Sequence, residues 1–190
     1  MSQRVCPWWL GCLLANPLRK LYSNPENILR PYVREGMTVL EVGSGMGFFT
    51  LPLARLAGES GRVVCVDVQE KMIRGLKRRA TRAGLIGRIE LRVNTPPSVG
   101  IDDLVEKVDF ALIFAVVHEV PDARQFLFEI HRSLKKGGLL LFSEPAGHVS
   151  KEEFGNTLAM AQTLGFRVAD SPQIRGSHSS LWVKDQASAT

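Results

Sequence analysis

Short apolar runs and longer amphipathic stretches alternate along this chain, and their order predicts the fold. Compact apolar runs bounded by glycine or polar residues are typical of buried strands. They occupy residues 38–42, 62–67, 88–93, 108–114, 138–143, 165–170 and 179–184. Apolar residues at helical spacing predict helices over residues 48–57, 70–83, 122–134 and 151–164. Strands that alternate with helices indicate a mostly parallel sheet with helices on both faces.

Local signals place the ends of several helices. Asp122, followed three residues later by Gln125, predicts a helix start. Asn24-Pro25 predicts the cap and first residue of a short helix. Helix ends are predicted at Gly84, Gly137-Gly138 and Gly165.

Residues 39–50, VLEVGSGMGFFT, combine an apolar strand, three alternate glycines and the start of an apolar helix. Glycine lets a backbone approach a ligand closely, and this context places the ligand at a helix N-terminus beyond the strand. A dinucleotide site expects G-x-G-x-x-G with a small last residue, but Phe48 stands there and would clash. Glu41 suits a cationic amine and would repel a pyrophosphate.

The second predicted strand ends in Asp67, at the position where an acidic residue binds ribose hydroxyls. An amine, a ribose and no pyrophosphate fit S-adenosylmethionine better than NAD. Residues 36–145 resemble the class I S-adenosylmethionine-dependent methyltransferase family, through Glu41–Gly47, Asp67, Val108–Phe114 and Leu134–Phe142. The resemblance implies a three-layer α-β-α Rossmann-like fold with a mostly parallel seven-stranded sheet. It also implies methyl transfer from S-adenosylmethionine.

The resemblance implies cofactor contacts from Glu41, Gly43, Ser44, Gly45, Gly47, Asp67, Val68, Met72, Asn94, Thr95 and Phe114. Glu41 would hold the amine directly or through water, and the glycines would line the methionine portion. Asp67 would accept from the ribose, with Val68 and Met72 beside the adenine. Many relatives carry an acidic residue after the third strand, whereas this chain has Asn94, whose carbonyl is an uncharged acceptor.

Methyl transfer from a sulfonium depends mainly on alignment, and a base is needed only where the nucleophile arrives protonated. His118 follows the fourth strand and titrates near neutrality, so it is the candidate base or orienting group. Glu144 leaves the fifth strand and faces the same crevice. Each has a structural alternative: a histidine bonded to loop backbone, and a carboxylate that orders a turn.

The acceptor is predicted to be a small molecule. Families that methylate amides or exocyclic amines carry Asn/Asp-Pro-Pro-aromatic after the fourth strand, where this chain has Phe114-Ala-Val-Val. The similar Asn94-Thr-Pro-Pro follows the third strand instead. Cytosine C5 methylation needs a nucleophilic cysteine, and the matching loop has none. An RNA or protein methyltransferase, or a non-catalytic module that binds an adenosyl ligand or NAD, remain the alternatives.

The net charge of +5 permits an anionic partner without requiring one. Basic residues at 71, 74, 78 and 82 follow helical spacing without interleaved aromatics, so a solvated face is favoured over a nucleic-acid site. Three scattered cysteines indicate a reducing compartment. No apolar run approaches the ~20 residues that span a bilayer. We expect a cytoplasmic protein without a membrane partner.

Residues 1–35 form an arm outside the domain of residues 36–190, rich in aromatic residues and proline. We interpret the arm as a lid over the crevice; packing along the sheet edge or in a homodimer contact is the alternative. The opening residues look somewhat like a signal peptide, but Pro7 interrupts the apolar run, so secretion or lipidation at Cys12 is disfavoured. Cys6 and Cys12 match no zinc pattern, and no metal is expected.

Overall fold

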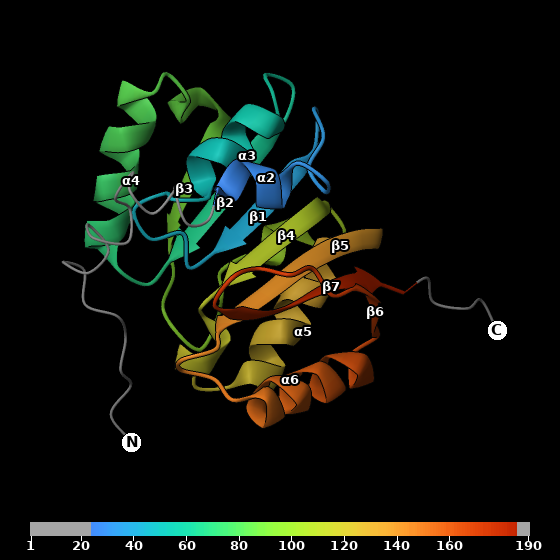
Figure 1. Ribbon diagram of the computed structural model, residues 1–190. Coiled ribbons are helices and arrows are strands. Elements are labelled where there is room, and N and C mark those ends of the chain that lie inside the picture. The colour runs from blue at the N-terminus through green and yellow to red at the C-terminus, as the bar shows by residue number, and fades with distance from the viewer. Residues whose placement is uncertain (1–23, 186–190) are drawn as a thin grey trace.

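Within residues 24–185, the sheet has seven strands in the order β3-β2-β1-β4-β5-β7-β6. The computed structural model describes residues 24–185 (Figure 1). The strands are β1 Thr38–Val42, β2 Arg62–Asp67, β3 Ile89–Val93, β4 Val108–Phe114, β5 Leu134–Pro145, β6 Phe166–Asp170 and β7 Ser177–Lys184. Only β7 runs antiparallel to its neighbours, β5 and β6. The predicted mostly parallel seven-stranded sheet is confirmed.

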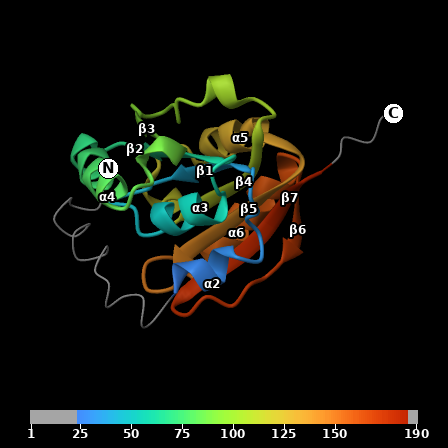
Figure 2. The ribbon, with the colours of Figure 1, turned by 90° about the horizontal axis from the view of Figure 1, so that it is seen from above.

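Helices cover both faces of the sheet (Figures 1 and 2). The α-helices are α2 Pro25–Leu29, α3 Thr50–Leu56, α4 Glu70–Arg82, α5 Ala123–Ser133 and α6 Lys151–Thr163. Short 3-10 turns lie at η2 Ile86–Arg88, η3 Asp102–Leu104 and η4 Val117–Glu119. One buried core lies under α2, α3 and α4, and the other under α5 and α6. The three-layer arrangement is therefore also confirmed.

Alternate residues of β1 face the two cores. Leu40 and Val42 enter the core under α5 and α6, and Val39 enters the core under α2, α3 and α4. Strands buried on both faces are near-continuous apolar runs, which is why the sequence predicts them well. β1 and β4 are neighbours whose following connections leave to opposite faces. A crevice for ligands is expected beyond their carboxyl ends.

Two predicted helix starts are confirmed by their hydrogen bonds. Asp122 Oδ1 accepts from Gln125 N at 2.9 Å, and Asn24 Oδ1 accepts from Glu26 N at 3.0 Å. The predicted role of Gly137-Gly138 as a helix end is wrong, because α5 stops at Ser133 and these glycines lie inside β5. The strand bulges there, because Val108 pairs with Leu134 and Phe110 already pairs with Leu139. A Cβ on Gly138 would lie 2.9 Å from the Lys135 carbonyl oxygen.

The described part of the arm packs on the molecule beside α3. Leu29 is fully buried, and Val33 is almost so, in the core under α2, α3 and α4. The Tyr32 ring stacks on Phe110 of β4, with centroids 6.1 Å apart. Cys6, Cys12 and the aromatic residues near them lie outside the described residues, so the role of the arm stays a prediction.

Candidate functional site

The three glycines between β1 and α3 all have left-handed backbone conformations, with φ of +76°, +53° and +84° for Gly43, Gly45 and Gly47. A Cβ on Gly43 would lie 2.3 Å from Val116, and one on Gly47 would lie 2.4 Å from Leu76. Packing therefore demands glycine at both ends of the loop. Gly45 differs, because nothing lies within 4 Å of a Cβ built there. That open side is where the loop can receive a ligand.

Helix α4 holds this loop from the side. Arg79 donates a hydrogen bond to the Met46 carbonyl oxygen, and the Met46 side chain would lie 3.1 Å from a Cβ on Gly75. Burial lowers the pKa of the Arg79 guanidinium. The chain offers no sequence signal for this contact, since Arg79 is one of several arginines on α4.

Glu41 lies beneath the loop and is 3% exposed. Its Oε2 accepts from Thr50 Oγ1 at 2.5 Å and lies 3.7 Å from Cys65 Sγ. Burial raises the pKa of Glu41 to about 8, and the bond from Thr50 opposes the rise. Glu41 therefore supports the start of α3, and its contact with a ligand amine stays a prediction. The neighbouring Ser44 hydroxyl is buried and has no hydrogen-bond partner among the described residues.

Asp67 joins the ends of β1 and β2. Gly45 N donates to its Oδ2 and Gln69 N to its Oδ1, both at 2.8 Å. Burial raises the pKa of Asp67, and these two bonds oppose the rise. Each oxygen keeps a further lone pair for a ligand hydroxyl. Of the two residues predicted beside the adenine, Val68 is 41% exposed, and Met72 is buried at 5%.

The predicted adenine edge lies next to Asp67. Asn94 N donates to the Asp67 carbonyl oxygen at 3.2 Å, so the ends of β2 and β3 are joined. The Asn94 side-chain nitrogen donates to Ser98 O at 2.9 Å. Thr95 is exposed. Phe114, at the end of β4, packs on Phe49 with ring centroids 4.7 Å apart.

The structure brings His118 and Glu144 together. His118 Nδ1 lies 2.6 Å from Glu144 Oε2, and Val117 N donates to Glu144 Oε1 at 2.7 Å. Glu144 is 1% exposed. Its hydrogen bond raises the pKa of His118, with burial acting against it and Glu119 adding to the rise. The carboxylate of Glu144 fixes the ring through Nδ1, and the other ring nitrogen, Nε2, lies 3.8 Å from Glu119 Oε1.

The segment that carries His118 is held against the Gly43–Gly47 loop. Ala115 adopts φ of +61°, rare for a residue with a side chain, and its N–H donates to Ser143 O at 2.8 Å. The next residue, Val116, occupies the space that a Cβ on Gly43 would need. Strained residues of this kind cluster at functional sites.

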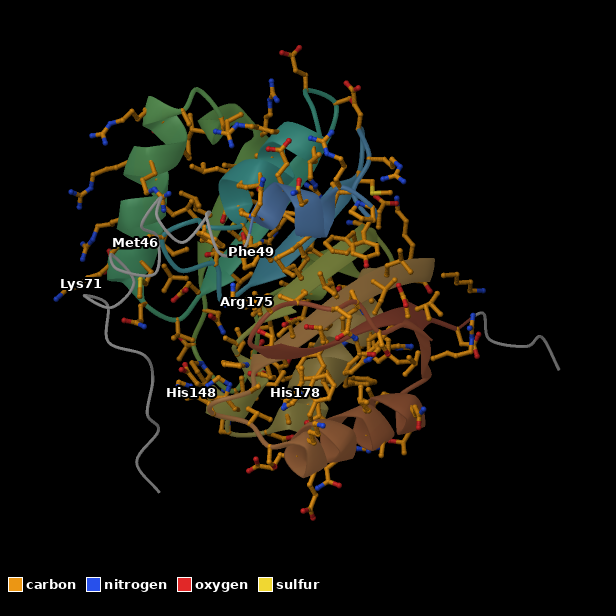
Figure 3. All side chains as sticks on the ribbon, in the orientation of Figure 1. Met46, Phe49, Lys71, His148, Arg175 and His178 are labelled. Carbon is orange, nitrogen blue, oxygen red and sulfur yellow. The ribbon has the colours of Figure 1, made fainter. Side chains whose placement is uncertain are left out.

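Two further histidines that the sequence did not single out lie near Glu144. The ring centroids of His148 and His118 are 5.9 Å apart. His178 of β7 lies opposite Glu144 of β5 in the register of the two strands. In Figure 3 both histidines lie below Met46 and Phe49, and Arg175 lies at a height between them. The sequence carried no signal for this grouping, because His118, His148 and His178 are 30 residues apart from one to the next.

Residues 24–185 contain no cluster of three or more histidine, cysteine, aspartate or glutamate side chains placed to bind a metal. None of the helices in the same range has the length and apolar character needed to cross a bilayer. The buried Ser44 hydroxyl, the open side of Gly45 and the free acceptor positions of Asp67 fit a small polar ligand at the loop.

Comparison with known proteins identifies the domain. Residues 33–182 match the model of a methyltransferase domain family. The chain is similar to the ubiquinone/menaquinone biosynthesis C-methyltransferase UbiE of Escherichia coli, 34% identical over 116 residues, which are 60% of this chain and 45% of the relative. The same enzyme of Hydrogenovibrio crunogenus is 32% identical over 112 residues, 59% and 43% of the two chains. The match thus spans less than half the length of these relatives.

Solved structures share the fold. A SAM-dependent methyltransferase from Aquifex aeolicus superposes with a TM-score of 0.82 at 24% identity, covering 94% of this chain and 98% of its own. A putative S-adenosyl-L-methionine-dependent methyltransferase from Methanococcus maripaludis has a TM-score of 0.79 at 15% identity, and each chain is covered completely.

Proposed function

This chain belongs to the family of S-adenosylmethionine-dependent methyltransferases, and from that premise we propose that it methylates a small-molecule acceptor. The observation that carries the proposal is the His118–Glu144 pair, with Nδ1 and Oε2 2.6 Å apart. The segment that carries His118 also holds Val116, which packs against Gly43 of the Gly43–Gly47 loop. The relatives from Escherichia coli and Hydrogenovibrio crunogenus are named as C-methyltransferases of quinone biosynthesis. That chemistry supports an acceptor with an acidic hydroxyl on an aromatic ring.

The cofactor would lie along the carboxyl ends of β1, β2 and β3. In this proposal the Gly43–Gly47 loop lines its methionine portion, Glu41 holds the amine, Asp67 holds the ribose, and Asn94 meets the adenine. When bound, S-adenosylmethionine supplies a methyl group on a positively charged sulfur leaving group. The protein then has to exclude water and align the acceptor, which supplies much of the rate enhancement in such reactions.

His118 would act as the base. An ionised carboxylate can only accept, so Glu144 Oε2 would accept a hydrogen bond from His118 Nδ1–H. The lone pair of the imidazole would then be on Nε2, which lies 3.8 Å from Glu119 Oε1. His118 Nε2 would then remove the proton of the acceptor hydroxyl. Glu144 would stabilise the positive charge that develops on the imidazole ring of His118. The deprotonated acceptor would take the methyl group through oxygen or through a ring carbon, and S-adenosylhomocysteine would leave as the bond from sulfur to the methyl carbon breaks. A methylated ring carbon would then lose its hydrogen as a proton.

The proposal extends to the arm: residues 1–35 would cover the crevice once ligands are bound. Comparing turnover and cofactor affinity of the full chain with those of a chain starting at residue 24 would test this role. A lid predicts a large loss of turnover with small effects on unfolding, because α2 and its buried Leu29 are kept.

The function is tested by turnover with methyl-labelled S-adenosylmethionine. Fractions of small metabolites, hydroxylated aromatic compounds, bulk RNA and denatured protein are offered as acceptors, with His118→Ala as the control. Label in a small aromatic product that disappears in the control supports the proposal. Label only in RNA or protein contradicts the acceptor class, and binding of NAD in place of S-adenosylmethionine contradicts the cofactor.

A further inference from the structure

Glu129 on α5 is a buried carboxylate that holds the loop after β3. It is 8% exposed. Its Oε2 accepts from Val99 N at 2.8 Å and from Ser98 Oγ at 3.3 Å, and its Oε1 accepts from Gln125 Nε2 at 3.2 Å. A buried carboxylate requires several donors. Two of these three donors come from the loop, so Glu129 determines where residues 98 and 99 lie.

The same loop orients Asn94. The Asn94 side-chain nitrogen donates to the carbonyl oxygen of Ser98, whose hydroxyl donates to Glu129. Ser98 Oγ also accepts from Gly100 N at 3.0 Å, which closes the turn. Because the nitrogen of the amide is used inside the loop, its oxygen is the atom left for a ligand. No described residue donates a hydrogen bond to that oxygen. The backbone of Asn94 is held beside Asp67, because Asn94 N donates a hydrogen bond to the Asp67 carbonyl oxygen at 3.2 Å.

We infer that Glu129 is a positioning residue for adenine recognition, acting through Ser98 on the amide of Asn94. The inference rests on the proposed cofactor site and adds a residue that does not touch the ligand. An adenine amino group donates to an amide oxygen, whereas the 6-oxo group of hypoxanthine sets oxygen against oxygen. The loop therefore favours adenine over hypoxanthine only while Glu129 keeps the Asn94 amide in this orientation.

The measurement is the ratio of affinities of the full chain for S-adenosylhomocysteine and its deaminated counterpart, S-inosylhomocysteine, by calorimetry. The wild type should prefer the adenosyl ligand by roughly tenfold, and Glu129→Ala should reduce the preference to about twofold. Asn94→Ala should reduce it equally, and the double variant no further, because both act on one contact. Both ligands bind only the folded protein, so the ratio does not depend on the folded fraction.

Conservative variants separate positioning from general stability. Glu129→Gln keeps an oxygen for Val99 N and should retain most of the preference. Glu129→Asp is one methylene shorter and should lose it, which provides a second test if Glu129→Ala does not fold. Glu152→Ala, at an exposed position of α6, is the matched control and should keep the wild-type ratio.

A wild-type ratio in Glu129→Ala and Glu129→Asp, or an equal loss of affinity for both ligands, would overturn the positioning role alone. A wild-type protein that binds neither ligand would instead overturn the proposed cofactor site, and the inference with it.

Discussion

Replacing Glu41 with glutamine should stabilise the ligand-free protein. The carboxyl is 3% exposed, and burial raises its pKa from 4.5 to about 8. The negative charge of Asp67 contributes a smaller rise in the same direction. Glutamine removes the ionisable proton and keeps an oxygen that can accept the hydrogen bond of Thr50. The variant therefore isolates the free energy of burying this carboxyl.

The magnitude follows from proton linkage. Between pH 4.5 and about 8 the folded protein keeps a proton on Glu41 that the unfolded chain has lost. The contribution of Glu41 to stability is thus fully present below pH 4.5. It falls by about 1.4 kcal/mol per pH unit up to about pH 8. At pH 7 the loss is roughly 3 kcal/mol, so Glu41→Gln should be more stable by a gain of that order.

Urea denaturation at pH 5, 6, 7 and 8 measures the difference directly, with Glu152→Gln on exposed α6 as the control. The free energy of unfolding of Glu41→Gln, minus that of the wild type, should grow steadily with pH. A difference that stays constant from pH 5 to 8, or a less stable variant at pH 7, would refute the reasoning. If Glu41 also holds the ligand amine, wild-type binding at pH 7 should release a proton, and the variant should bind more weakly without that release.

Four further predictions concern ligand binding and catalysis. Gly45→Val should abolish S-adenosylmethionine binding in calorimetry, because it fills the open side of the loop; undiminished affinity would contradict the cofactor position. Asp67→Ala should weaken binding at least tenfold, since bonds to a charged acceptor contribute about 1.5–3 kcal/mol each, and a loss below twofold would mean the carboxylate serves only the loops. His118→Ala should lower kcat by about 10²- to 10⁴-fold with cofactor affinity nearly unchanged. Glu144→Gln should also lower kcat, because the glutamine amide can hold His118 in the wrong imidazole tautomer. Full turnover in either variant would contradict the role of His118 as a base.

Much of the fold could be predicted from the sequence, because the buried strands and their flanking helices have distinct periods. The ranges predicted for β1, β2 and β4 match the structure to the residue. The start of β5 was missed, since a strand that bulges around Gly137-Gly138 has the local pattern of a helix end. Turns such as η4 are too short to leave a periodic pattern.

The sequence by itself determined the glycine loop and the candidate acids, because these depend on residue type at short spacing. Only the tertiary structure decided what each side chain contacts. His118 and Glu144 are 26 residues apart and meet because β4 and β5 are neighbours in the sheet. Glu129 reaches Val99 across 30 residues. The physical reason is that such pairs are created by strand order and helix packing, and local hydrophobic periodicity contains no information about either.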